Sequence, residues 1–178
     1  MNTLKFKITQ NEFLEYHLYS NSSSRSNVNK RLWLRLFLAI SYVIFGIYLY
    51  FFSDLYLSVL FIIVGILWYF IFPSRIKKTH TNFYKKHINK NYQKRMLSET
   101  ELSFENNLFY LKDSSTESKF NATEIEEIIE LKTLFIIKIK NGSQLLLSKK
   151  NENNVAIAKG IFNEIGVEIQ DESDWQWK

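Results

Sequence analysis

The chain has 178 residues, of which 46% are hydrophobic and 16% aromatic, and it carries a formal net charge of +5 at pH 7. This length accommodates one soluble domain, or a small soluble domain joined to a membrane anchor. The sequence contains no cysteine, which excludes disulfides, thiolate metal sites and a cysteine nucleophile. The polar residues 1–31 lack the apolar stretch of a secretory signal peptide, so we expect no cleaved leader.

Two uncharged apolar runs, residues 36–52 and 55–72, are separated by only two residues. A helix of this length spans about 26 Å, and including residues 32–35 brings the first helix close to the roughly 30 Å of a bilayer's hydrocarbon core. We therefore predict a transmembrane helical hairpin at residues 32–73, with helices at about 32–52 and 55–72. A buried hairpin of a soluble protein is less favoured, because its apolar runs are usually about ten to fourteen residues long.

Charged residues around this hairpin are distributed asymmetrically. Between Glu15 and Glu99 the only acidic residue is Asp54, at the turn, whereas Lys and Arg residues flank both outer ends of the hairpin. The positive-inside rule then puts both flanks, and with them both termini, in the cytoplasm. We predict a multi-pass protein of the bacterial inner (plasma) membrane. The candidate contacts for anionic lipid headgroups are Lys30, Arg31, Arg35, Arg75, Lys77 and Lys78.

Aromatic residues give a second indication of the membrane boundaries, because Trp and Tyr prefer the two membrane–water interfaces. The residues expected at these interfaces are Trp33, Trp68 and Tyr69 near the basic end, and Tyr48, Tyr50 and Tyr56 near the turn. Arg35 lies one turn inside the first segment, where we favour a side chain that reaches the cytoplasmic headgroups over an ion or substrate path. Asp54 is interpreted as the N-cap of the second helix rather than as a proton relay.

A basic stretch follows the hairpin, at residues 74–97, and its apolar residues recur at helical spacing. This pattern predicts a juxtamembrane helix. Basic and aromatic residues together are also typical of nucleic-acid surfaces, but the neighbouring membrane segment favours contact with anionic lipids. His80 and His87 are seven residues apart and have no nearby carboxylate. We therefore expect neither a metal site nor nucleic-acid binding.

The hydrophobic pattern then changes from helical to alternating, which predicts a β-rich cytoplasmic domain at residues 98–178. From residue 99 onward the chain has fifteen acidic and nine basic residues, so its basic character comes from the membrane flanks. The expected elements begin with a hairpin around Asn106-Asn107, a turn at 113–115 and strands at 118–122 and 125–131. A second hairpin has a type I′ turn at Asn141-Gly142. The last element is a helix at 154–165, which is capped by Asn151 or Asn154 and ends at Gly166.

The predicted fold class is α+β: a transmembrane helical hairpin with an antiparallel, β-barrel-like domain of pleckstrin-homology type, capped by the C-terminal helix. The segments most typical of a known family are residues 4–9, 12–15, 118–120, 125–128 and 145–149. Through them the chain resembles the YcxB-like family of bacterial membrane proteins, although Phe120 replaces the family's tryptophan and Ser148 its proline. The resemblance implies an N-terminal strand and helix with a Ser-rich linker in residues 1–31, an integral membrane protein, and no established catalytic activity.

Enzyme motifs are not found in the sequence, which has no P-loop, glycine-rich dinucleotide loop, HExxH or GxSxG element. One carboxylate cluster remains, and in a strand three of its members would share a face. A solvated acidic strand edge is the favoured interpretation, and acid–base catalysis is an alternative. We expect no enzymatic activity and no cofactor. The members of this cluster are Glu124, Glu126, Glu127 and Glu130.

The favoured function is protein–protein interaction or regulation by the cytoplasmic domain, with an unidentified protein or a second copy as partner. Acidic residues beside the first β-hairpin disfavour phosphoinositide binding. Trp175 and Trp177 in the acidic tail are candidate partner contacts, and docking on the protein's own sheet is an equal alternative. A second function is a membrane-embedded immunity or defence factor against an envelope-targeting toxin. A third, less favoured, is an enzyme of unknown class that uses the glutamate cluster.

Overall fold

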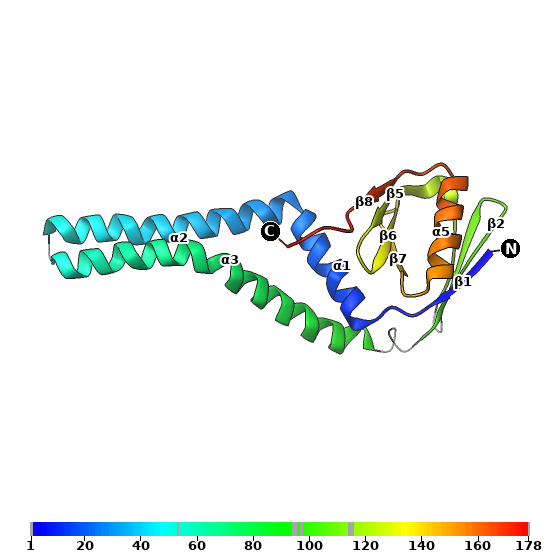
Figure 1. Cartoon of the computed structure of the whole chain (residues 1–178), viewed down its shortest axis with the longest axis horizontal. Helices are drawn as coiled ribbons and strands as arrows, with labels where there is room; N and C mark the ends of the chain where they lie inside the picture. Colours follow the sequence, from blue (N-terminus) through cyan, green and yellow to red (C-terminus); the bar gives the residue numbers. More distant parts are fainter. Residues whose placement is uncertain (1, 53, 94–95, 97, 114–115, 178) are drawn as a thin grey trace. The chain divides into compact units, whose positions relative to one another are not determined.

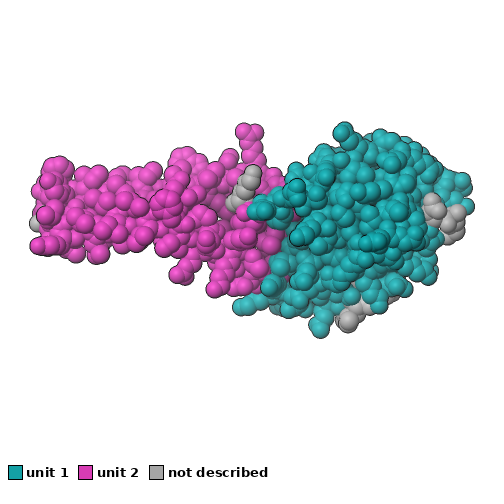
Figure 2. Space-filling view, viewed as in Figure 1, with its two compact units in different colours: residues 1–17, 85–176 teal, residues 18–84, 177–178 magenta. Residues whose placement is uncertain are grey.

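A computed structural model describes residues 2–52, 54–93, 96, 98–113 and 116–177. The chain divides into two compact units, which Figure 2 distinguishes by colour. The β unit comprises residues 1–17 and 85–176, and the hairpin unit comprises residues 18–84 and 177–178. Two basic residues of the predicted juxtamembrane helix, Lys94 and Arg95, and most of the predicted turn at 113–115 lie outside the described residues.

The hairpin unit is built mainly from two long helices, α2 (Arg25–Phe52) and α3 (Leu55–Asn91), which lie side by side (Figure 1). Only Ser24 lies between the helix α1 (Gln10–Ser23) and α2, so the segment predicted to be a Ser-rich linker is almost entirely helical. Within α1, the hydroxyl of Ser22 donates to the carbonyl oxygen of Tyr19 over 3.0 Å. The helix α3 continues through the predicted boundary at residue 73 as one helix of 37 residues.

Small residues bring α2 and α3 together. A Cβ atom added to Gly46 would lie 2.7 Å from a side-chain carbon of Ile62, and one added to Gly65 would lie 3.0 Å from the carbonyl oxygen of Ala39. Ala39, Gly46 and Gly65 are themselves buried. The two helix backbones therefore approach each other more closely at these points than larger side chains would permit. The glycines shape the contact within the hairpin.

The β unit contains two four-stranded sheets. The first has the order β1 (Asn2–Phe6), β2 (Thr100–Glu105), β3 (Leu108–Lys112) and β4 (Glu117–Asn121), and each neighbouring pair is antiparallel. The second has the order β7 (Gln144–Ser148), β6 (Leu134–Ile139), β5 (Ile125–Glu130) and β8 (Ile169–Asp171), and β8 runs parallel to β5. The strands predicted from the alternating pattern are present, whereas β8 was not predicted.

A closed barrel is not formed by the described strands, which corrects the predicted architecture. Between β4 and β5 the chain makes a short 3-10 turn, η1 (Ala122–Glu124), instead of a ladder. Asn121 accepts from the backbone of Thr123, and Glu124 accepts from the backbone of Asn121, so side chains satisfy the turn. β1 forms an edge of the first sheet, and in a closed barrel this edge would pair with another strand. Here Asn154 of the C-terminal helix donates to the carbonyl oxygen of Lys5 in β1 over 2.8 Å, so a helix lies at this edge instead.

The type I′ turn lies in a different hairpin from the one predicted. Asn106 and Asn107 both have positive φ, 50° and 64°, which is typical of the type I′ turn of a two-residue hairpin. In the β6–β7 hairpin only Gly142 has positive φ, and its N–H donates to the carbonyl oxygen of Ile139 over 2.8 Å. A type I turn followed by a left-handed glycine fits this pattern. The hairpin at Asn141-Gly142 is therefore confirmed, but its predicted turn type is wrong.

The N-terminal residues belong to the β unit rather than to a separate segment. β1 pairs with β2 along its length, and Glu12, which is buried, sits in the first turn of α1. Its carboxylate accepts from the backbone N–H and the hydroxyl of Thr9, at 2.6 and 2.5 Å, and from the hydroxyl of Ser148. The bond from the Thr9 N–H is one half of a capping box, and the bond from Ser148 joins the start of α1 to the end of β7.

The C-terminal helix α5 (Glu152–Glu164) lies close to the predicted range. Asn151 caps it by accepting from the backbone N–H groups of Asn153 and Asn154, and Gly166 follows its end with a φ of 69°. Phe162 on its inner face meets Phe135 of β6 edge to face, with the ring centroids 5.5 Å apart. The core of the β unit is therefore formed where α5 packs on the second sheet.

Candidate functional site

The largest apolar surface of the chain is that of the hairpin helices. Both α2 and α3 are long and apolar enough to cross a membrane, and only 11% of the most apolar stretch of each is buried. Large hydrophobic side chains project outward along both helices; Ile44, for example, is 61% exposed. The core helix of a soluble domain would bury such residues. An exposed apolar surface of this extent requires a nonpolar environment or a partner.

The predicted interface aromatics are mostly on this outer surface. Five of them are exposed, and Trp68 is half-buried with its ring 5.5 Å from that of Phe72. Among the predicted headgroup contacts, four basic side chains are exposed and two arginines are half-buried. The exposed aromatics are Trp33, Tyr48, Tyr50, Tyr56 and Tyr69; the exposed basic residues are Lys30, Arg75, Lys77 and Lys78; the half-buried arginines are Arg31 and Arg35.

Asp54 caps the start of α3. Its carboxylate accepts from the backbone N–H of Tyr56 over 2.7 Å, and its carbonyl oxygen accepts the first helical bond, from Ser58. This confirms the N-cap interpretation, because the carboxylate satisfies an N–H group that has no partner inside the helix.

Arg35 makes a contact that the sequence interpretation missed. Its Nε donates to the carbonyl oxygen of Tyr69 over 2.9 Å, and its guanidinium lies 3.7 Å from the centre of the Tyr69 ring. Pro73 follows Tyr69 by one helical turn and has no N–H to donate to that carbonyl. Arg35 therefore satisfies an acceptor that the proline leaves open inside α3. The signal was a proline in an otherwise continuous helical pattern, with an arginine on the facing helix.

Arg31 joins the tail of the chain to α2. Its Nη1 donates to the side-chain oxygen of Asn21 over 2.7 Å, and its guanidinium lies 4.6 Å from the centre of the Trp177 ring. Trp177 also meets His80, with ring centroids 5.5 Å apart. Burial, and secondarily the charge of Arg31, lower the pKa of His80. Trp177 thus contacts the two helices of the hairpin unit, and not the sheet that the sequence analysis gave as its alternative docking place.

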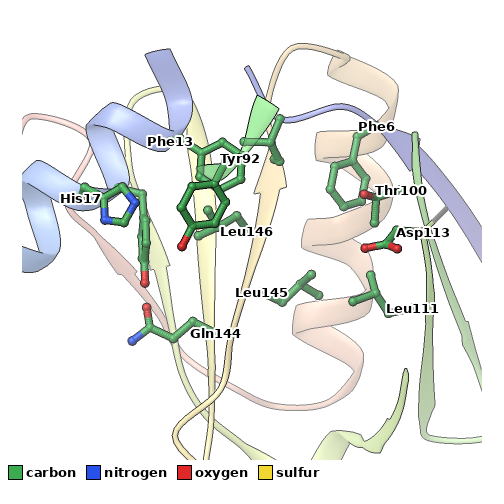
Figure 3. Close-up of a pocket in the computed structure, with 12 residues that line it drawn as sticks. Phe6, Phe13, His17, Tyr92, Thr100, Leu111, Asp113, Gln144, Leu145 and Leu146 are labelled. Atoms are coloured by element: carbon green, nitrogen blue, oxygen red, sulfur yellow. The ribbon is translucent and has the colours of Figure 1, made fainter. Parts of the chain in front are cut away.

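A small cavity of about 160 Å³ lies in the β unit (Figure 3). It is lined by apolar and aromatic side chains with a few polar groups among them. Phe13 from α1 packs against Tyr92, with ring centroids 5.1 Å apart, and the opposite wall comes from β7. Pockets for metabolites usually measure about 300 to 1,000 Å³, so this one has room for a single side chain. The lining residues are Phe6, Ile8, Phe13, Tyr16, His17, Tyr92, Thr100, Leu111, Asp113, Gln144, Leu145 and Leu146.

Two titratable groups of this cavity, Tyr16 and His17, are shifted toward their neutral forms. Burial, followed by the neighbouring His87, lowers the pKa of His17, and the two imidazole rings meet edge to face at 6.1 Å. Burial, followed by Tyr92, raises the pKa of Tyr16. Both groups are therefore uncharged at neutral pH. Aromatic walls with a few polar groups, Asp113 among them, suit an apolar or hydrogen-bonding side chain.

The glutamate cluster of β5 is largely taken up by local contacts. Glu130 lies between Lys149 and Lys159, at 2.6 and 2.9 Å, and Glu127 pairs with Lys138 at 2.7 Å. Burial raises the pKa of Glu130, but hydrogen bonds from the two lysines outweigh it and leave the pKa below its ordinary value. A β-bulge between residues 125 and 127 interrupts the alternation on which the prediction of a shared face depended. These carboxylates hold strands and helix together.

Trp175, the other candidate partner contact, is half-buried, and its backbone N–H donates to the carbonyl oxygen of Glu172 in a turn of the β unit. Among the described residues, no three His, Asp or Glu side chains are grouped so that they could hold a metal ion. Comparisons of the chain with protein-family models, curated proteins and solved structures found no match. Inference about function therefore rests on the residues themselves.

Proposed function

We propose that the chain is an integral protein of the bacterial inner membrane, anchored by the α2–α3 hairpin, and that its β unit is a cytoplasmic interaction module. The observation that carries the anchor is the exposed apolar surface of both helices, whose contact is made by small residues. The apolar part of each helix matches the roughly 30 Å of a bilayer core. Basic residues at the ends of the hairpin favour a cytoplasmic location for both termini.

An interaction role for the β unit is supported by the size of its cavity and by its fold. Two antiparallel-rich sheets followed by a packed C-terminal helix are consistent with a module of pleckstrin-homology type. The cavity of about 160 Å³ has room for one side chain of a protein partner but is small for a metabolite. The ion pairs of Glu127 and Glu130 give the carboxylate cluster a structural explanation, so a catalytic function is not favoured.

The anchor is tested by placing a charge on its surface. In a bilayer, Ile44→Lys near the middle of α2 costs about 2.5 to 3.5 kcal/mol of insertion free energy, whereas on a water-exposed helix the change is harmless. Phe83→Lys is the matched control, because Ile44 and Phe83 are both 61% exposed but Phe83 lies ten residues beyond Pro73. We expect Ile44→Lys to lower the membrane-integrated fraction after alkaline washing, and Phe83→Lys to leave it unchanged. Equal behaviour of the two variants would exclude the anchor.

The interaction role is tested by photo-crosslinking in cells. A photoreactive amino acid at Gln144, on the cavity wall, should form an adduct with a protein, while the same amino acid at the exposed Glu164 of α5 should not. Adducts of equal intensity from both positions, or from neither, would contradict a binding role for the cavity.

A further inference from the structure

The hairpin unit has two cavities of different chemistry whose lining residues are neighbours on both helices. The first, of about 310 Å³, is lined by Arg31 and Arg35 among apolar residues of both helices, and by Trp177. The second, of about 370 Å³, is lined by apolar residues and Tyr69. Leu32 of the first cavity and Leu36 of the second are neighbours on α2, and Arg35 of the first donates to the carbonyl oxygen of Tyr69, which lines the second. The two cavities therefore form one groove, basic at one end and apolar along the rest.

Among the described residues of the hairpin unit, no acidic side chain lies at the basic end of this groove. Within residues 18–84 the only acid is Asp54, which caps the far end of α3 about nineteen residues, or roughly 28 Å of helix, from Pro73. Arg31 uses Nη1 to bind Asn21, but its Nη2 is buried and has no hydrogen-bond partner among the described residues. A buried guanidinium nitrogen without an acceptor is costly, and an anionic oxygen is the acceptor that it binds best.

The order of these features along the helices determines the ligand class. Arg31 and Trp177 lie at the end that flanks the apolar segments, the depth at which lipid headgroups and interfacial tryptophans occur. The apolar part of the groove extends from there toward the middle of the hairpin, the depth of acyl chains. A free phosphate would use only the first cavity and would leave the second one empty. A phospholipid matches both.

We propose that this groove binds one anionic phospholipid, with its phosphate on Arg31 and Arg35 and an acyl chain along Leu36, Ile40 and Ile44. The inference rests on the proposed membrane anchor, because it assigns headgroup and chain depths to the two ends of the groove. The site differs from diffuse attraction to a basic flank, since it depends on two half-buried arginines and on an apolar channel that adjoins them.

The test measures lipid binding to the full chain in a neutral detergent by native mass spectrometry, with phosphatidylglycerol and phosphatidylcholine as probes. The chain should bind phosphatidylglycerol in preference to phosphatidylcholine and should retain one molecule of it. Arg31→Gln should weaken its binding about tenfold, as expected for the loss of one charge-assisted contact. Arg75→Gln removes the same charge from an exposed position near the same end of the hairpin and should change binding less than twofold.

Two further variants test the apolar part of the groove. Ile40→Trp fills the second cavity and should weaken binding of phosphatidylglycerol without changing any charge, whereas Ile63→Trp, at a similarly exposed residue outside the lining, should not. If Arg31→Gln and Arg75→Gln weaken the binding of phosphatidylglycerol equally, general surface charge attracts the lipid and there is no specific site. Displacement of the lipid by inorganic phosphate would assign the groove to a free anion and overturn the lipid inference.

These results are separable from the test of the anchor. If Ile44→Lys impairs insertion and phosphatidylglycerol is not preferred, the lipid site is wrong and the anchor stands. If Ile44→Lys inserts as well as Phe83→Lys, the anchor is wrong whatever the detergent-solubilised chain binds.

Discussion

At the scale of single residues, Arg35 compensates for a proline on the other helix. Pro73 cannot donate to the carbonyl of Tyr69, and Arg35 supplies the missing donor at 2.9 Å. We expect Arg35→Ala to destabilise the hairpin by about 1.5 to 3 kcal/mol, the usual range for a hydrogen bond to a charged group. Thermal or denaturant unfolding of the full chain in detergent measures this loss.

A double-mutant cycle separates this role from general packing. Pro73→Ala restores an N–H that can bond to the Tyr69 carbonyl, so Arg35→Ala should cost much less in that background. If the two substitutions add without interaction, the carbonyl of Tyr69 does not depend on Arg35, and this explanation of the arginine is incorrect.

Glu130 gives the β unit a defined response to acid. Its pKa is lower in the folded protein than the ordinary value of about 4.3 in an unfolded chain. Ionised Glu130 therefore contributes stability that is fully present above about pH 4.3 and is lost as the pH falls through the folded pKa. We expect Glu130→Gln to lower the thermal midpoint at pH 7, and we expect its difference from wild type to become smaller as the pH falls below about 4.3. Glu126→Gln, at an exposed residue of the same strand, should have little effect at either pH.

Local residue roles were the most predictable from the sequence. Asp54, Asn151 and Gly166 act within a few positions of themselves, so capping rules identify them. The partner of Arg35 lies 34 positions away, and no local rule identifies such a contact. The same holds for Glu12 and Ser148, which are 136 positions apart. Long-range hydrogen bonds of this kind depend on how elements pack, which a local pattern does not contain.

At the scale of elements, two glycines in helices have opposite roles. Gly160 in α5 has open space around it, so Gly160→Ala should stabilise the β unit by about 1 kcal/mol through helix propensity alone. Gly65 in α3 lies against α2, where a larger side chain must displace the backbone at Ala39. Gly65→Leu should therefore destabilise the hairpin by about 1 to 3 kcal/mol.

Thermal unfolding of the purified chain compares the two substitutions. Stabilisation by Gly65→Leu would show that the contact between α2 and α3 is assigned incorrectly. A loss of stability on Gly160→Ala would show that the face of α5 at this residue is not free.

Strongly periodic elements were predicted well, and edge elements were not. The apolar runs of the hairpin and the alternating strands β2, β3, β5 and β6 each have a clear hydrophobic period. The strand β8 has three residues, of which two are exposed, so it has no such signal. The barrel-like arrangement is not confirmed, because the described strands form two sheets: η1 interrupts the pairing between β4 and β5, and Asn154 contacts the edge formed by β1.

At the scale of the whole molecule, the β unit is formed by two segments that are far apart in the sequence. Residues 1–17 complete a sheet whose other strands begin at residue 100, and the hairpin lies between them in the sequence. The sequence-based division at residues 31, 73 and 97 follows composition and so separates β1 from the sheet it joins. Because β1 pairs with β2, both chain segments that leave the hairpin must lie on the same side of a membrane that the hairpin crosses.

The central claim is that the hairpin crosses the membrane with its basic ends in the cytoplasm. The absence of cysteine makes a direct test available, because single cysteines can be labelled without background. We would treat spheroplasts with a membrane-impermeant maleimide after introducing Tyr56→Cys at the turn, Lys78→Cys beyond the basic end, or Gln176→Cys in the tail. The account predicts labelling of Tyr56→Cys in intact spheroplasts and of the other two only after permeabilisation. Labelling of Gln176→Cys in intact spheroplasts, or protection of Tyr56→Cys, would contradict it.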